Sequence, residues 1–147
     1  MSKDNIIDSL THVLWDTHMV MTRLLLGVAE FWWAALLAWP GDTFGRPTYL
    51  HMASVMGEES WALVFFASSV TQITIVLRRD FHSALARYFA AWNMVLWVYV
   101  VVSMLASVYP PPAAISAEIT LAMAAVWIWL RPYLLLRGIE RARESRF

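Results

Sequence analysis

A 21-residue apolar stretch from Met19 to Trp39 constrains this chain more than any other feature. About 20 apolar residues are enough for a helix to cross a bilayer, yet this stretch carries Arg23 and Glu30. An ionised side chain at the bilayer centre costs at least about 2.5–3.5 kcal/mol. Arg23, Gly27 and Glu30 are spaced four and three residues apart, so they share one helix face. That face must meet protein, water or another charge, and the remaining chain must supply it.

Three further apolar segments follow, at about 60–77, 84–109 and 112–136, each about as long as a membrane crossing requires. Hydrophobic residues make up 60% of the chain, above the roughly 45–50% of soluble domains. The sequence therefore predicts an all-α, polytopic membrane protein with four transmembrane helices, forming a single membrane domain over 1–147.

The connections between these segments contain most of the charge and the helix-breaking residues. Residues 1–18 are predicted to form a cytoplasmic amphipathic helix, because apolar side chains recur at three- and four-residue spacing. No proline or glycine separates it from the first crossing, so one long helix is an open alternative. The outer loop, 40–59, is predicted to contain a short helix from Pro47 to Met56, with the proline at its first position.

The predicted boundaries of the later helices rest on capping residues. Glu58 and Glu59 precede the crossing that begins near residue 60, where the helix dipole favours negative charge. Asp80 is the predicted N-cap of the next helix. Gly138 is the predicted end of the last helix, which leaves 138–147 as a short basic cytoplasmic tail.

The distribution of basic residues predicts the orientation. If the N-terminus is cytoplasmic, ten of the 11 Lys and Arg residues lie on the inner side and only Arg46 lies in an outer loop. This bias follows the positive-inside rule. Both termini are therefore expected in the cytoplasm, with the lipid bilayer as the first partner.

Four polar residues in the apolar segments are the candidate site: Arg23, Glu30, Gln72 and Asn93. At 1.5 Å per residue, Gln72 and Asn93 each lie about 10 Å from the inner face, between the depths of Arg23 and Glu30. One hypothesis is an intramembrane polar cluster that relays protons or ions, with Glu30 as the titrating group. The alternatives are that these side chains only hold helices together, or that a protonated Glu30 faces an identical subunit.

Glu118 is a second candidate, near the outer end of the fourth predicted crossing. It is interpreted either as lining an outer vestibule or as reaching the lipid headgroups.

The sequence offers little support for catalysis or for a cofactor. It contains no cysteine, and its four histidines do not share a helix face or a depth in the membrane as haem or metal ligation requires. No nucleophile–base pair, phosphate loop or paired-carboxylate motif is present. The basic residues are few and lie at the membrane, so nucleic-acid binding is not expected. We expect no enzymatic activity, no metal and no cofactor.

The segment WPGDTFGRPTY, from Trp39 to Tyr49, resembles one found in small membrane proteins of tailed bacteriophages and prophages. The resemblance covers roughly the first half of the chain and implies a location in the bacterial inner membrane. It implies no catalytic residues. Holins are the best-known small phage membrane proteins, but they usually have one to three crossings, whereas four are predicted here.

The expected function is that of a non-enzymatic inner-membrane protein that self-associates or binds another membrane protein. A phage-encoded role in holin-like lysis or superinfection exclusion would fit the resemblance. Two alternatives stay open, a small proton- or ion-coupled transporter or channel that uses Glu30, and an accessory subunit of a larger membrane complex.

Overall fold

The fold is entirely helical over the residues described by the computed structural model, which are 3–81, 83–108 and 115–144, with side chains over 17–81, 83–108, 115–131 and 133–134. Its elements are the helices α1 (Lys3–Ala38), α2 (Leu50–Val55), α3 (Glu58–Arg78), α4 (Ala84–Ser107) and α5 (Ile115–Glu144), and the short 3₁₀ helix η1 (Pro47–Tyr49). The predicted all-α class is confirmed. Three helical segments are long and apolar enough to cross a membrane: Thr17–Ala38, α3 and α4.

The fourth predicted crossing, 112–136, is not among the three found in the described part of the chain, which includes the side chains of only 115–131 and 133–134 in this segment. Glu118, Arg131 and Pro132 interrupt its apolar run. The predicted end of this helix at Gly138 is wrong, since α5 continues to Glu144. A glycine inside a helix costs only about 1 kcal/mol relative to alanine, and the Leu, Arg and Glu residues around it are good helix formers.

The N-terminal segment predicted as an amphipathic helix is helical from Lys3 onward, and the alternative of one long helix is confirmed. This segment and the first crossing form one continuous helix, α1, of 36 residues. The absence of proline and glycine at their junction allows this, and α1 ends at Ala38, just before Trp39 and Pro40, because proline disfavours helix at the residue before it.

The short helix predicted in the outer loop is confirmed in position. Its first turn is η1, with Pro47 at the first position, and α2 continues to Val55. Glu58 and Glu59 occupy the first turn of α3, as their charge predicts.

The prediction that Asp80 is the N-cap of α4 is wrong, and the turn between α3 and α4 explains why. Arg79 has a left-handed backbone (φ 52°), and the amides of Arg79 and Asp80 donate to carbonyls of the preceding turn at 3.1 Å each. This is the Schellman arrangement that ends helices. Asp80 thus terminates α3, and the cap of α4 is Ser83, whose Oγ accepts from the Ala86 amide at 3.0 Å.

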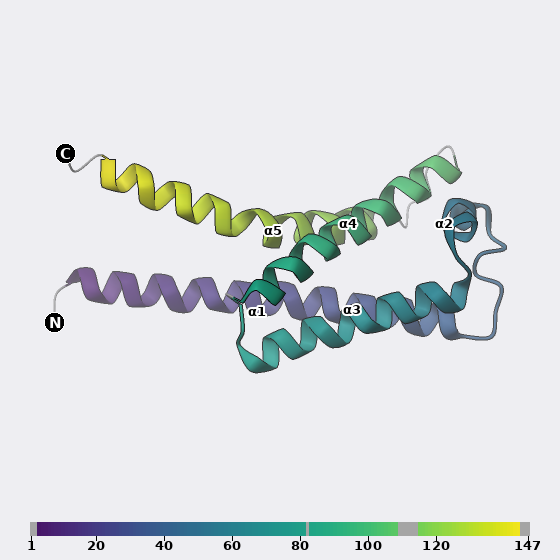
Figure 1. The fold of residues 1–147 in the computed structure, drawn as a ribbon, viewed down its shortest axis with the longest axis horizontal. Helices are drawn as coiled ribbons and strands as arrows, with labels where there is room; N and C mark the ends of the chain where they lie inside the picture. The colour runs from purple at the N-terminus through teal and green to yellow at the C-terminus, as the bar shows by residue number, and fades with distance from the viewer. Residues whose placement is uncertain (1–2, 82, 109–114, 145–147) are drawn as a thin grey trace.

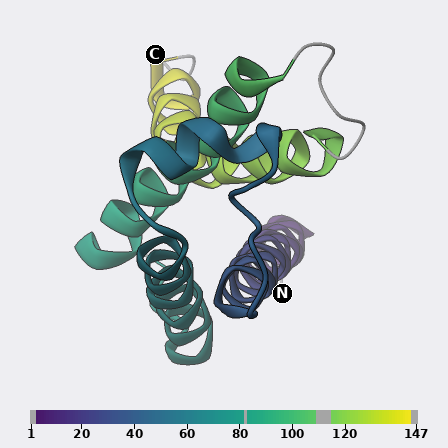
Figure 2. The ribbon, with the colours of Figure 1, turned by 90° about the vertical axis from the view of Figure 1, so that its right-hand side faces the viewer.

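The helices pack as two pairs, α1 with α3 and α4 with α5, while η1 and α2 lie against α4 (Figures 1 and 2). The beginning of α1 and the far end of α5 lie at the same end of the molecule (Figure 1). We call this side of the molecule the basic end, because α3 finishes on it with Arg78 and Arg79 and α4 begins on it near Arg87, while α1 and α5 extend beyond that turn (Figure 1). The opposite end, which contains η1 and α2, is the loop end.

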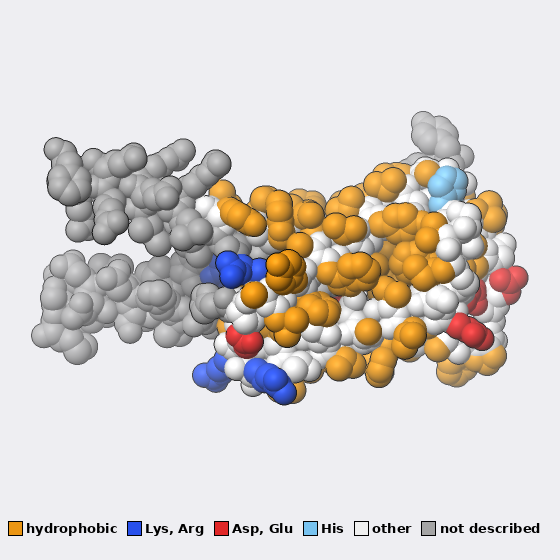
Figure 3. Space-filling view, in the orientation of Figure 1, with side chains coloured by type: hydrophobic (Ala, Val, Ile, Leu, Met, Phe, Trp, Pro, Cys, Tyr) orange, Lys and Arg blue, Asp and Glu red, His pale blue; other side chains and the backbone are white. Residues whose placement is uncertain are grey.

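The surface between the two ends is broadly hydrophobic, with Lys and Arg gathered toward the basic end (Figure 3). Large apolar side chains are exposed on all four long helices, including Trp32, Leu77, Val95 and Met123. Such a surface is unfavourable in water and suits contact with lipid, which agrees with the three apolar helical segments.

Candidate functional site

The site begins at a close contact between α1 and α3. Ser69 Oγ donates to the Gly27 carbonyl oxygen at 2.7 Å. A Cβ at Gly27 would lie 3.3 Å from Ile73 Cγ1 and 3.4 Å from Gln72 Cβ, which is tighter than ordinary contact. Glycine therefore lets the two backbones approach, as small residues do in membrane helices. The polar face predicted on α1 from spacing is turned into the bundle.

Arg23 lies one turn toward the basic end from this contact and is only 2% exposed. Its Nη1 donates to Gln72 Oε1 at 2.8 Å, and its Nη2 donates to the Ala86 carbonyl oxygen at 3.2 Å. The guanidinium thus connects α1 to both α3 and α4. Its Nε is buried with no partner among the described residues.

Glu30 lies on the other side of Gly27, toward the loop end, and is fully buried. Its Oε1 accepts from Trp97 Nε1 on α4 at 3.3 Å. Its Oε2 is buried with no hydrogen-bond partner in the described part of the chain. A carboxylate enclosed in this way needs a proton, a cation or a water molecule to complete its interactions.

Gln72 and Asn93 are also buried and only partly hydrogen-bonded. Gln72 Oε1 is occupied by Arg23, whereas its Nε2 has no described partner. Asn93 Nδ2 donates to the Phe89 carbonyl oxygen of its own helix at 3.0 Å, and its Oδ1 has no described partner.

The structure therefore places all four predicted residues in the interior, and we call Arg23, Glu30, Gln72 and Asn93 the polar core. Within it, the hydrogen bonds join Arg23 to Gln72, while Glu30 is joined to Trp97. That the four act together as a functional cluster stays a prediction. Sequence reasoning missed Trp97. The available signal was that a buried indole N–H usually finds an acceptor, and Glu30 is one.

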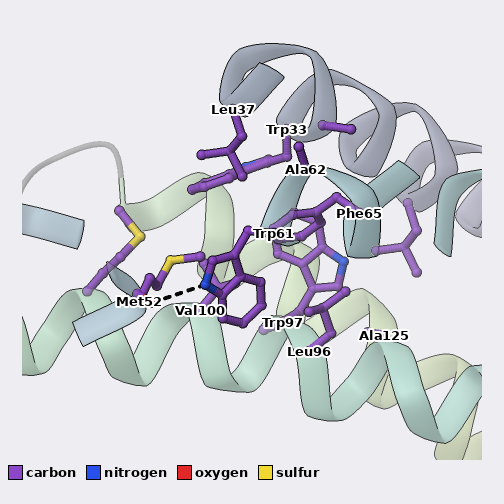
Figure 4. Close-up of a cluster of buried hydrophobic side chains, with 14 of the residues drawn as sticks. Trp33, Leu37, Met52, Trp61, Ala62, Phe65, Leu96, Trp97, Val100 and Ala125 are labelled. Carbon is purple, nitrogen blue, oxygen red and sulfur yellow. Dashed lines mark hydrogen bonds between the residues drawn. The ribbon is translucent and has the colours of Figure 1, made fainter. Parts of the chain in front are cut away.

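Beyond Glu30, the interior toward the loop end is filled by aromatic rings. We call Trp33, Tyr49, Trp61, Phe65, Trp97 and Tyr99 the aromatic cap (Figure 4 labels four of them). Ring centroids lie 5.4 Å apart for Trp33 and Phe65, 5.8 Å for Phe65 and Trp97, and 5.5 Å for Trp61 and Tyr99. Trp97 thus belongs to both regions, with its ring in the cap and its N–H on Glu30.

The loop covers this cap through hydrogen bonds as well as packing. Trp61 Nε1 donates to the Met52 carbonyl oxygen at 3.0 Å, and Tyr99 Oη donates to the His51 carbonyl oxygen at 3.4 Å. The Phe44 amide donates to the Glu58 carboxylate across the base of the loop. These contacts hold α2 over the ends of α3 and α4.

Glu118, the predicted vestibule residue, is only 9% exposed. Burial raises the pKa of the Tyr49 hydroxyl, the Glu118 charge adds to that rise, and Arg46 opposes it. Glu118 is therefore within electrostatic reach of the loop. Whether it lines a vestibule stays a prediction.

No group of three or more His, Cys, Asp or Glu side chains that could hold a metal ion occurs among the described residues. No protein-family model, curated protein or solved structure matches this chain. The candidate site must therefore be interpreted from its own geometry.

Proposed function

We propose that the chain crosses the bacterial inner membrane four times, with the basic end in the cytoplasm. α5 supports a fourth crossing, because it lies alongside α4 and returns to the end where α1 begins. The ten-to-one bias of basic residues supports the orientation.

Within that arrangement, we propose a small proton-coupled transporter or channel in which Glu30 binds and releases the proton. The observation that carries the proposal is the fully buried Glu30 carboxylate with one hydrogen-bonded oxygen and one oxygen without a described partner. A carboxyl group kept only to join helices would be expected to use both oxygens, because unsatisfied polar groups in a membrane are costly.

The surroundings of Glu30 favour a proton over a larger cation and suggest the direction of access. A metal cation needs several ligands, and no group of three or more His, Cys, Asp or Glu side chains occurs among the described residues, whereas one carboxylate is enough to bind a proton. The Arg23 guanidinium lies between Glu30 and the basic end, where its charge opposes the entry of cations from that side. Gln72 and Asn93 keep unpaired polar atoms that can hold water between the two charged groups. The aromatic cap closes the other side, so release toward the loop end requires movement of Trp97.

Proton flux in liposomes tests this proposal directly. The purified chain is reconstituted with a pH-sensitive dye inside, and flux is driven by a potassium-diffusion potential. We expect flux above that of protein-free liposomes, at least a tenfold loss in Glu30→Gln, and partial retention in Glu30→Asp.

The matched control is Glu118→Gln, which removes the other buried carboxylate at the loop end and should keep most of the flux. Circular dichroism and elution profile verify that each variant is folded. Equal flux in wild type and Glu30→Gln, or no flux above empty liposomes in the wild type, would refute the proton pathway.

The topology has its own test, because the chain contains no cysteine. Single cysteines are introduced at Ser54, Asp80, Ser116 and Gly138 and labelled with a membrane-impermeant maleimide on intact spheroplasts. Labelling at 54 and 116 with protection at 80 and 138 is expected for four crossings. Labelling at 138 would leave α5 on the outer side and reject the fourth crossing.

A second candidate function is self-association or binding to another membrane protein, and one observation favours it. Phe31 and Phe66 form an exposed ring pair with centroids 6.4 Å apart, and Trp32, the next residue along α1, is 64% exposed. Aromatic residues are enriched in protein interfaces. Chemical cross-linking between copies tests this role, with Trp39→Ala as the control for Trp32→Ala. A loss of cross-linking in Trp32→Ala alone would support self-association, including the holin-like or exclusion role expected from the phage resemblance. Unchanged cross-linking would argue against this surface.

A further inference from the structure

A cavity opens at the basic end, on the opposite side of Arg23 from Glu30. Its volume is about 90 Å³, and it lies between α1, the start of α4 and the middle of α5. A single water molecule needs roughly 10–15 Å³ on the same measure, so the cavity accepts a group of several heavy atoms.

Among the described residues that line this cavity, the two charged ones are both cations. Arg23 lies at its inner wall and Arg87 is exposed on the α4 side. No Asp or Glu is among the described residues that line it. Arg23 Nε has no partner among the described residues, although the side chain is 98% buried, which leaves donor capacity for an additional acceptor.

The other lining residues are of two kinds. Phe81, Trp129 and Tyr133 are aromatic, and Trp129 and Tyr133 are of the types that concentrate at the membrane interface. Ala90 and Ile128 give the cavity an apolar wall toward the membrane interior, and Met19 adds apolar surface one turn nearer the basic end than Arg23. The cavity therefore combines a cationic wall, an aromatic rim and an apolar floor.

We propose that this cavity binds the phosphate group of an anionic membrane lipid, with Arg23 and Arg87 as its ligands. Arginine donors match phosphate oxygens in a fork geometry, and basic pockets between membrane helices on the cytoplasmic side bind anionic headgroups. The apolar floor receives the start of the acyl chains. The lipid phosphate would then complete the hydrogen bonding of Arg23 from the side that Gln72 and Ala86 leave open.

This inference does not depend on proton binding at Glu30. It requires only that the basic end lies at the headgroup level, and Glu30→Gln is expected to keep the lipid site intact.

Native mass spectrometry of the full chain tests the proposal, with phosphatidylglycerol, phosphatidylcholine and inorganic phosphate as separate probes. We expect one tightly retained phosphatidylglycerol per chain, little retained phosphatidylcholine, and a rise in melting temperature with phosphatidylglycerol. Arg87→Gln should weaken retention about tenfold, since it removes one charge-assisted contact. Arg23→Gln should weaken it further, and if that variant does not fold, Arg87→Gln carries the test.

The matched control is Arg78→Gln, an exposed arginine at the same end that does not line the cavity. Its retention of lipid should equal that of the wild type. A rise in melting temperature with inorganic phosphate alone, lost in Arg87→Gln, would support the phosphate site and assign it to a soluble ligand. Either of two results would overturn the proposal. One is equal retention of the two lipids with no change in melting temperature on addition of inorganic phosphate. The other is an equal loss of lipid retention in Arg78→Gln and Arg87→Gln.

Discussion

The interior of this bundle is filled in two different ways on either side of Glu30. Toward the loop end, the aromatic cap fills the space with rings, and the indole of Trp61 is satisfied by a loop carbonyl 3.0 Å away. Toward the basic end, the polar core fills the space with charged and amide side chains, and each of the four keeps one buried polar atom without a described partner. Buried polar groups in folded proteins are usually paired, and exceptions need an explanation such as water, an ion or a reaction. The comparison teaches that the cap is built for packing and that function should be sought in the polar core.

Trp97 is the residue where the two regions meet, and its truncation is expected to have the largest effect. Trp97→Ala removes a fully buried ring from the cap and the donor to Glu30, with an expected cost of about 3–5 kcal/mol in the free energy of unfolding. Unfolding by sodium dodecyl sulfate in mixed micelles measures it.

Trp97→Phe separates the two contributions, because it keeps a ring and removes the N–H. We expect a smaller loss of about 0.5–1.5 kcal/mol, close to that of one hydrogen bond. If both variants lose the same stability, the Glu30 hydrogen bond dominates and the division between cap and core fails at this residue.

Variants of Gln72 measure how much its hydrogen bond with Arg23 stabilises the polar core. Gln72→Leu leaves Arg23 Nη1 without its 2.8 Å acceptor inside the bundle. Hydrogen bonds to charged groups contribute about 1.5–3 kcal/mol, so a loss in that range is expected in the same unfolding assay. Gln72→Glu is the control, because it restores an acceptor of the same length and should retain wild-type stability or exceed it. If Gln72→Leu leaves the free energy of unfolding unchanged, Arg23 Nη1 donates to water in place of Gln72.

Ser69 is expected to show the smallest effect, since its hydroxyl contributes one neutral contact to the Gly27 carbonyl oxygen. Interhelical hydrogen bonds of this kind contribute about 0.6 kcal/mol on average in membranes, and Ser69→Ala should lose about that much. Thr71→Ala is the matched control, because its hydroxyl bonds to the Ala67 carbonyl of its own helix. Equal changes in the two variants would show that the α1–α3 contact depends on packing at Gly27 and not on this bond.

Much of the fold was predictable from local chemistry. The helical class follows from the length of the apolar segments. Proline explains the breaks at Trp39-Pro40 and in the segment 40–59, and the helix dipole explains the acidic first turn of α3. The errors occurred where two local signals competed. The side chain of Asp80 is of a type that caps helices, but its backbone amide donates a hydrogen bond that ends α3. Gly138 favours a helix end, but the helical propensity of the residues around it is stronger, and α5 continues past it.

The candidate site was predictable in its residues but not in its partners. Arg23, Glu30, Gln72 and Asn93 were identifiable because polar side chains in apolar runs are costly and must turn inward. Depth along a helix suggested Gln72 and Asn93 as neighbours of Glu30, but depth alone does not determine which helices face one another.

The sequence by itself determined that this chain is helical, that it is built for a membrane, and that one face of its first long helix carries the polar residues. These properties follow from composition, spacing and the cost of charge in lipid. Only the tertiary structure decided that Gln72 accepts a hydrogen bond from Arg23 while Trp97 donates one to Glu30. It also decided that Arg23 and Arg87 line one cavity. Those pairings depend on the close approach of α1 and α3 at Gly27 and on the rotation of α4 against them, which arise from packing between segments distant in the chain.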